Sequence, residues 1–144
     1  MKTLAALAVS IVLVSMLFCP MVMAFPPMPN DVQVVQPDPS LPKELAALLG
    51  KWEGKGPYST IFLIVEKIGG EKASLYEWHS GHSGGVPEGW QRIEAKVIKE
   101  YGKYKLWYQS TLGQLGSTNV ECTLKGKDLS YGFGQISYRF TRVP

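Results

Sequence analysis

The sequence predicts an all-β protein: an eight-stranded antiparallel up-and-down β-barrel with a short N-terminal helix. Three observations favour this fold. After Gly50, apolar and polar residues alternate with a period of two, which is typical of half-buried strands. Glycine-containing turns separate the alternating segments and indicate hairpins. No connection is long enough for the crossover helix that a parallel sheet needs.

Eight segments carry the strand pattern. The first is short, at 51–54, and the clearest is 92–97, where Arg, Glu and Lys alternate with Ile, Ala and Val. The other expected strands are 59–67, 72–78, 104–109, 120–124, 129–133 and 136–141. An open meander leaves two unpaired edges, so we expect the last strand to close against the first. A barrel of this size is filled by side chains or holds one small ligand. The alternative is a two-sheet sandwich.

The connections predict a difference between the two ends of the barrel. Tight turns at 68–71, 99–103 and 125–128 alternate along the chain with looser connections at 54–58, 79–89 and 111–117. Alternate connections of an up-and-down barrel lie at opposite ends. One end is therefore expected to be sealed, and the other, which also receives the tight turn 134–135, to be ringed by loops. Ligand-binding barrels have this asymmetry.

A short amphipathic helix is expected between Ser40 and Gly50. Ser40 can cap it, Pro42 suits its first turn, and Gly50 ends it. Its apolar face consists of Leu41, Leu45, Leu48 and Leu49. A helix of about two turns is not stable alone, so this face must dock on the barrel. We expect it to cover Phe62 and Ile64, the outward apolar residues of strand 59–67.

The N-terminus resembles a signal peptide over residues 1–24. An apolar run at 4–18 is followed by an A-x-A-like site for cleavage before Phe25, which predicts an exported protein, periplasmic or secreted. The alternatives are an uncleaved anchor helix and a lipoprotein modified at Cys19. Residues 25–39 hold five prolines and are expected to form a disordered leader. The barrel domain then spans residues 40–144.

Composition excludes several classes of function. The formal net charge of +3 includes Lys2 of the signal peptide, and no basic cluster occurs, so a nucleic-acid partner is not expected. After cleavage Cys122 is the only cysteine. It cannot form an internal disulfide or a cysteine-based zinc site, and it is expected to be a small buried apolar residue. The mature chain has no apolar run long enough to span a membrane.

The segment Gly50-Lys51-Trp52 resembles the G-x-W signature of the calycin superfamily, which includes lipocalins, avidins and fatty-acid-binding proteins. The resemblance implies that Trp52 plugs the closed end of the barrel and that a basic residue of the last strand lies across it. Arg142 has the inward parity and is the candidate. Segments 63–68 and 87–90 are also similar to small barrel domains of exported bacterial proteins.

Both histidines of the chain, His79 and His82, fall in the long glycine-rich connection. They are weak candidates for a metal site, to which Glu77 and Glu88 could add oxygen ligands. A first-row metal needs three or four ligands, and no second cluster points toward these residues. We therefore expect both histidines to be solvated loop residues. No metal or other cofactor is expected.

Catalytic chemistry has little support in the sequence. Ser80 and Ser83 lie near the histidines, but no strained G-x-S-x-G elbow presents either hydroxyl. Glu94 and Glu121 alternate with the inward residues of their strands and are therefore expected on the outer face, which removes two carboxylates that glycoside hydrolysis could use. The protein is not expected to be an enzyme.

Four aromatic residues lie near the loose ends of their strands and are the candidate ligand-binding residues: Tyr76, Trp78, Trp90 and Tyr108. Aromatic walls with a few hydroxyl groups suit a small, partly apolar ligand. The alternative is that they only fill the core. The expected function is non-catalytic binding of a small apolar or aromatic molecule. The other possibility is a structural or interaction module tethered by the leader, which an exposed apolar patch on strand 59–67 would favour.

Overall fold

The structure is a computed structural model that describes residues 26–56, 59–80, 89–113 and 116–144. The predicted signal peptide at 1–24 lies outside the described residues. So do His82, Ser83 and Glu88 of the long connection.

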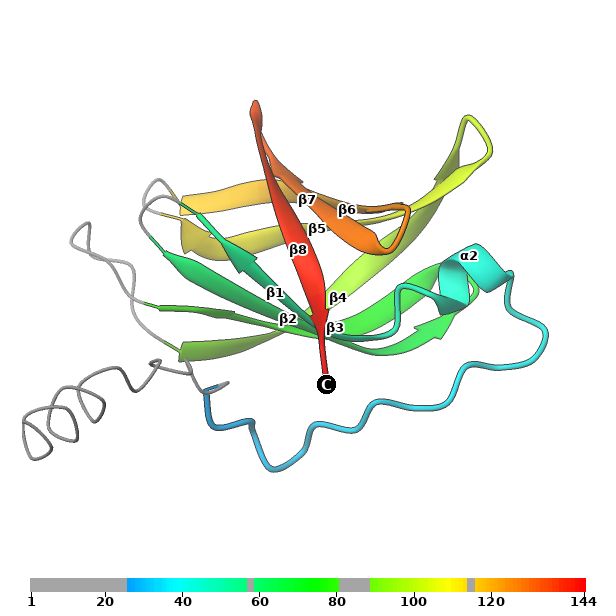
Figure 1. Cartoon of the computed structure of the whole chain (residues 1–144), viewed down its shortest axis with the longest axis horizontal. Helices are drawn as coiled ribbons and strands as arrows, with labels where there is room; N and C mark the ends of the chain where they lie inside the picture. Colours follow the sequence, from blue (N-terminus) through cyan, green and yellow to red (C-terminus); the bar gives the residue numbers. More distant parts are fainter. Residues whose placement is uncertain (1–25, 57–58, 81–88, 114–115) are drawn as a thin grey trace, which may run out of the picture.

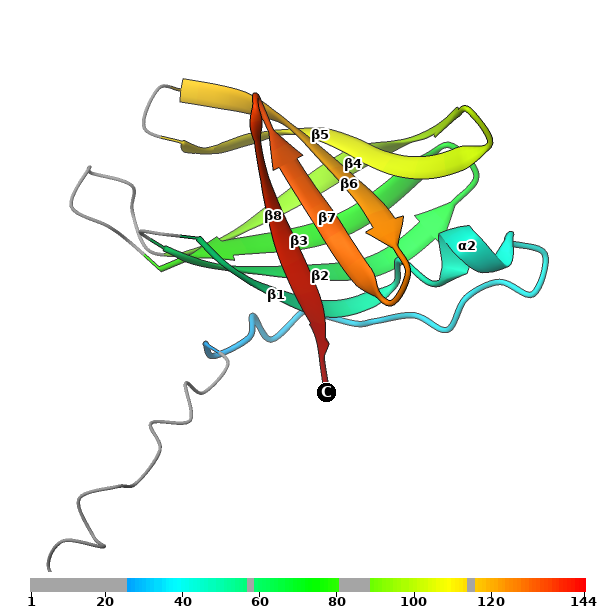
Figure 2. The same cartoon turned by 45° about the horizontal axis from the view of Figure 1, so that its top comes forward.

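Eight strands form a closed antiparallel barrel in the order of the chain (Figure 1). They are β1 (Gly50–Lys55), β2 (Thr60–Gly69), β3 (Lys72–His79), β4 (Gly89–Glu100), β5 (Lys103–Gly113), β6 (Gly116–Lys125), β7 (Asp128–Phe133) and β8 (Ile136–Val143). The barrel closes where β8 pairs with β1, with Trp52 opposite Arg142 and Gly54 opposite Phe140 (Figure 2). The predicted fold class is confirmed, and the sandwich alternative is wrong. In general shape the barrel agrees with the calycin architecture.

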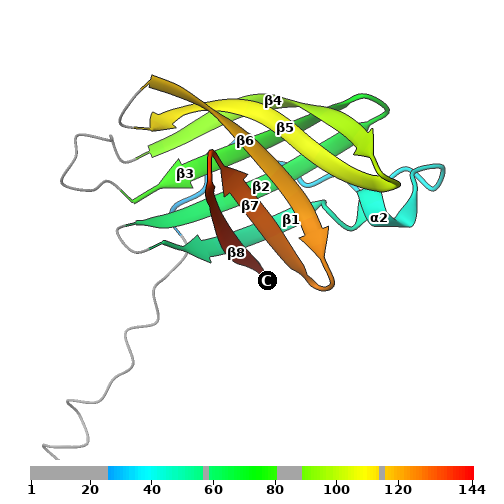
Figure 3. The same cartoon turned by 90° about the horizontal axis from the view of Figure 1, so that it is seen from above.

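The helix α2 (Lys43–Ala46) lies at the end of the barrel that carries the tight turns, which we call the base (Figure 3). Leu45 of α2, and Leu48 and Leu49 after the helix, are buried in the same core as Trp52. The Trp52 indole Nε1 donates a hydrogen bond of 3.0 Å to the Leu48 carbonyl. The helix segment thus closes the base. The prediction that it covers Phe62 and Ile64 is wrong, because its leucines are used at the barrel end.

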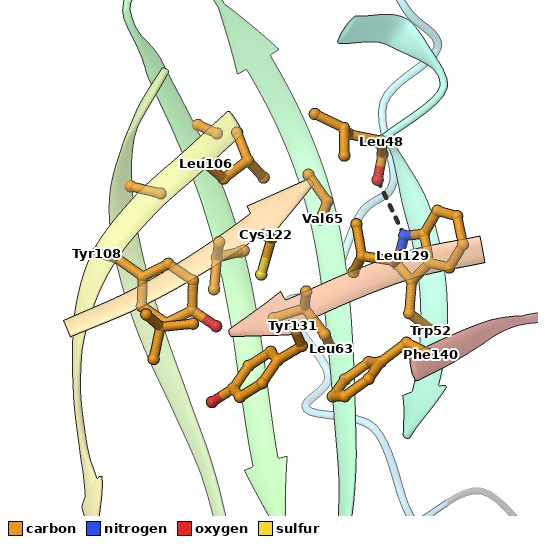
Figure 4. Packing of buried hydrophobic residues seen from close by; sticks show 14 of the residues in the cluster. Leu48, Trp52, Leu63, Val65, Leu106, Tyr108, Cys122, Leu129, Tyr131 and Phe140 are labelled. Atoms are coloured by element: carbon orange, nitrogen blue, oxygen red, sulfur yellow. Dashed lines mark hydrogen bonds between the residues drawn. The ribbon is translucent and has the colours of Figure 1, made fainter. Parts of the chain in front are cut away.

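Trp52 and Arg142 form the closure of the base. Trp52 is fully buried, and the Arg142 guanidinium carbon lies 4.2 Å from the centre of its ring. The same guanidinium donates hydrogen bonds of 2.7 Å to the carbonyls of Ala47 and Leu49. It therefore joins the last strand to the segment that follows α2. Figure 4 shows Trp52, Leu48, Leu129 and Phe140 packed together at this end.

The proline-rich leader runs along the outer face of β2, β3 and β4 (Figure 1). It has no helix or strand, yet it bonds to the barrel at several points. The Val35 amide donates to the Glu66 carbonyl at 2.8 Å, and the Trp90 indole donates to the Pro27 carbonyl at 2.8 Å. The Tyr76 hydroxyl donates to the Asp31 carboxylate at 2.5 Å. The leader is thus the segment that lies over this face of the sheet.

Candidate functional site

The four aromatic residues predicted to bind ligand do not line one site. Strand alternation places Tyr76, Trp78 and Trp90 on the outer face, beneath the leader, and Tyr108 inside the barrel. Trp78 stands opposite Trp90 on β4 and Phe62 on β2, with ring centroids 6.5 and 5.4 Å away. The three outer rings form an aromatic row that the leader crosses. Only Tyr108 faces the interior.

A buried carboxylate occupies the open half of the interior. Glu77 of β3 is fully buried and stands between the two outer aromatics Tyr76 and Trp78, so it points inward. Its Oε1 accepts hydrogen bonds from the hydroxyls of Tyr108 at 2.9 Å and Tyr131 at 2.5 Å. Figure 4 shows these two tyrosines, from β5 and β7, with their hydroxyls in the interior.

The second carboxylate oxygen has two further donors. Ser110 Oγ donates to Glu77 Oε2 at 2.5 Å, and Gln91 Nε2 lies 3.3 Å away. Strands β3, β4, β5 and β7 therefore all contribute to one polar cluster, Glu77 with Gln91, Tyr108, Ser110 and Tyr131. We call it the Glu77 cluster. A buried carboxylate needs such donors, because an unpaired one is very costly inside a protein.

Glu77 is held in its ionised form. Burial by itself raises the pKa of this carboxyl, but the neighbouring His79 imidazole and the hydroxyls of Ser110 and Tyr131 outweigh it. The resulting pKa lies below the usual value of a glutamate. The interior of the open half therefore carries a negative charge at neutral pH.

The hydroxyls and the thiol near this charge stay protonated. Burial and the charge of Glu77 raise the pKa of Tyr108 and of Tyr131 well above the usual tyrosine value. Burial likewise raises the pKa of the Cys122 thiol, followed by the effect of Glu77. The tyrosines consequently act as hydrogen-bond donors. Cys122 is a buried, unreactive residue of the core, as expected.

His79 lies at the open edge of the Glu77 cluster. Its Nε2 is 3.8 Å from Glu77 Oε2, beyond hydrogen-bond distance, and this buried nitrogen has no hydrogen-bond partner among the residues that the structure describes. Within the described ranges, no group of three or more histidine, cysteine or acidic residues is placed to hold a metal ion. The second histidine of the weak metal prediction, His82, lies outside those ranges.

Strands β4 and β5 separate toward the open end (Figure 1). They pair only between Lys96–Glu100 and Lys103–Trp107. Beyond that point a cleft of about 480 Å³ lies between them, and its lining includes Gln91, Tyr108 and Thr111. The side chains of Thr111 and Gln91 bridge it with a hydrogen bond of 2.6 Å. Since Gln91 also contacts Glu77, the cleft leads to the buried carboxylate.

The opposite wall of the interior is aromatic. Tyr131 stacks on Phe140 with ring centroids 4.8 Å apart, and Tyr138 lies 6.4 Å from Tyr131 and 6.2 Å from Phe133. These residues have the inward parity of β7 and β8. The alternation at 129–133 and 136–141 was the sequence signal that could have selected them, together with Tyr108, as interior aromatics.

The other residues considered for catalysis have structural roles. Ser80 closes the end of β2: its Oγ accepts a hydrogen bond of 2.8 Å from the Thr60 amide, and its own amide donates to the Thr60 carbonyl. Glu94 and Glu121 project outward and pair with Lys72 and Lys105 at 2.7 and 3.1 Å.

Comparisons with known proteins give no relative: the chain matches no family model, no curated protein and no solved structure. In the part of the chain that the structure describes, no helix has the length and apolar character needed to cross a membrane.

Proposed function

We propose that this protein is an exported, non-catalytic barrel of calycin-like type that binds one small molecule in its open half. The observation that carries the proposal is the Glu77 cluster, a buried ionised carboxylate bonded to Gln91 and Tyr108, which line the cleft between β4 and β5. Polar groups that converge on an opening are typical of ligand sites.

The energetic cost of Glu77 supports a functional role. Replacing buried charged groups by apolar residues of similar volume often stabilises a protein by about 1–4 kcal/mol. If this position only had to fill the interior, a leucine would be suitable. Leu75 on the same strand is such a buried residue. A buried group whose pKa is lowered by its neighbours and whose hydrogen-bond partners line a cleft is a candidate site residue on physical grounds.

The chemistry around Glu77 favours binding over catalysis. The hydroxyls of Tyr108 and Tyr131 are kept protonated and are directed at Glu77, so they are poor nucleophiles. Glu77 itself accepts hydrogen bonds at both oxygens and has little basicity left. An aromatic wall formed by Tyr131, Phe133 and Tyr138 suits the apolar body of a ligand.

Native mass spectrometry of the purified protein tests this proposal. We expect a retained or added small molecule at one per chain, and its loss in Thr111→Trp, which fills the cleft from its rim. The matched control is Thr141→Trp, because Thr141 is also an exposed threonine but lies on the outer face of β8, next to Glu53 of β1. A protein that stays bare under all conditions, or equal binding in the two variants, would contradict the proposal.

The structural or interaction module remains the second candidate, supported by the leader on the outer face. An exposed apolar patch on β2 would have favoured it more strongly, but Phe62 and Ile64 are 2% and 0% exposed. A bare protein in the native mass spectra would make it the preferred function.

A further inference from the structure

We infer that the ligand of this barrel is a small organic cation with N–H donors, such as an amine, amidine or guanidine, bound through the cleft between β4 and β5. The inference rests on the proposed function and specifies the chemical class of the ligand. Four features of the described interior carry it: its charge, a replaceable donor, an unused acceptor and a route of entry.

The charge of the interior is unbalanced. The Glu77 carboxylate is surrounded by neutral donors: two tyrosine hydroxyls, a serine hydroxyl and an amide. Among the residues the structure describes, the lysine and arginine ion pairs all involve other carboxylates, and His79 is the only basic side chain within 4.0 Å of the Glu77 carboxylate. A cation at this point would gain charge-assisted hydrogen bonds that a neutral or anionic molecule cannot make.

Gln91 occupies the position that a ligand nitrogen would take. Its Nε2 lies 3.3 Å from Glu77 Oε2 and 3.4 Å from Ser110 Oγ, both at the long end of the hydrogen-bond range. The three hydroxyl donors are much closer, at 2.5 to 2.9 Å. The Gln91 amide is therefore the weakest donor of the cluster. It also lines the cleft, so an entering ammonium or amidinium group can displace it.

The unused acceptor is His79 Nε2. This nitrogen is buried, has no hydrogen-bond partner among the described residues, and lies 3.8 Å from the same carboxylate oxygen. A group with two N–H donors can reach the Glu77 carboxylate with one and His79 Nε2 with the other. An anionic ligand would place a like charge beside the carboxylate, and an acceptor-only ligand would offer it no hydrogen bond.

Isothermal titration calorimetry with three probes of one shape tests the inference: benzamidine, benzamide and benzoate. We expect benzamidine to bind the wild-type protein roughly tenfold or more tightly than benzamide, because charge-assisted hydrogen bonds are about twice as strong as neutral ones. Benzoate is expected not to bind. Tighter binding of benzoate than of benzamidine would overturn the inference.

Three variants locate the cation. Glu77→Gln keeps the size of the side chain but removes the charge, and it should weaken benzamidine binding by roughly tenfold or more. Glu121→Gln is the matched control, because Glu121 is an exposed carboxylate on the outer face of β6 that pairs with Lys105 and is not part of the cleft lining, and it should leave binding unchanged. Unchanged affinity in Glu77→Gln, or an equal loss in Glu121→Gln, would contradict the assignment.

Gln91→Ala gives a test that does not depend on the folding of the Glu77 variant. Removing the competing amide should tighten benzamidine binding by roughly 2- to 10-fold, since one weak hydrogen bond no longer has to be broken. Weaker benzamidine binding in this variant would contradict the inference that the ligand displaces the Gln91 amide. If the wild-type protein binds a neutral probe such as benzyl alcohol but not benzamidine, the cation class is wrong and the proposed function stands. If it binds neither and is bare in native mass spectra, both fail.

Discussion

The base of the barrel and its open half are packed in different ways. At the base, apolar side chains surround Trp52, and the Arg142 guanidinium lies on its ring and donates to backbone carbonyls at the edge. In the open half, a buried carboxylate takes the central place and is held by side chains from four strands.

This difference indicates that the base and the open half have different roles. Apolar burial stabilises in proportion to the area removed from water and needs no particular geometry. A buried charge adds little net stability and requires each donor to be in place. We therefore expect stability to depend mainly on the base and ligand recognition on the open half. The predictions that follow test this difference, from the largest expected effect to the smallest.

Trp52→Ala is expected to have the largest effect on stability. It opens a cavity under the leucines that follow α2, removes the surface on which Arg142 packs, and leaves the Leu48 carbonyl without its donor. Replacing a buried tryptophan by alanine costs about 3–5 kcal/mol. Urea denaturation measures the loss. The control is Trp107→Ala on the outer face of β5, and an equal loss in the control would contradict the special role of the base.

Gly54→Ala should destabilise the protein by about 1–3 kcal/mol, the usual cost of overpacking. A Cβ at Gly54 would lie 2.0 Å from the Phe140 ring, and that ring is fully buried and stacked on Tyr131. The control is Gly132→Ala on β7, where a Cβ would meet only ordinary contacts, the nearest at 3.6 Å. Thermal denaturation that ranked the control as the more damaging variant would refute this packing.

Acid should weaken the open half through Glu77. The folded-state pKa of this group lies below the unfolded value of about 4.3. Its contribution to stability is therefore complete above the unfolded value and is lost as the pH falls through the folded-state pKa. The difference in unfolding free energy between wild type and Glu77→Gln should shrink between pH 6 and pH 3. A difference independent of pH would contradict a charged Glu77, and Glu94→Gln is the control.

The sequence predicted the barrel because its strands alternate clearly from 92 onward and glycine marks most of the turns. The calycin resemblance implied a basic residue of the last strand across Trp52, and strand parity selected Arg142 for that position. These features are local, and the pairing of neighbouring strands follows from them.

The same reasoning could not find the site, for a physical reason. On β2 and β3 both faces are apolar, because the leader covers the outer one, so hydrophobicity does not distinguish inside from outside. From the sequence, Glu77 was therefore considered a possible oxygen ligand of a metal beside the histidines and not an inward group. Its shared parity with Ala73 and Leu75 was the available signal. The separation of β4 from β5 depends on curvature of the whole barrel and has no local sequence signature.

Carbon-13 NMR of the Glu77 side-chain carboxyl, assigned by comparison with Glu77→Gln, tests the central claim most directly. The account predicts that this carbon keeps the chemical shift of an ionised carboxylate from neutral pH to below the ordinary glutamate pKa. It also predicts that the signal moves when benzamidine is added at pH 7. A carboxyl that is protonated at pH 7, or a signal that does not respond to benzamidine at concentrations where calorimetry detects binding, would contradict it.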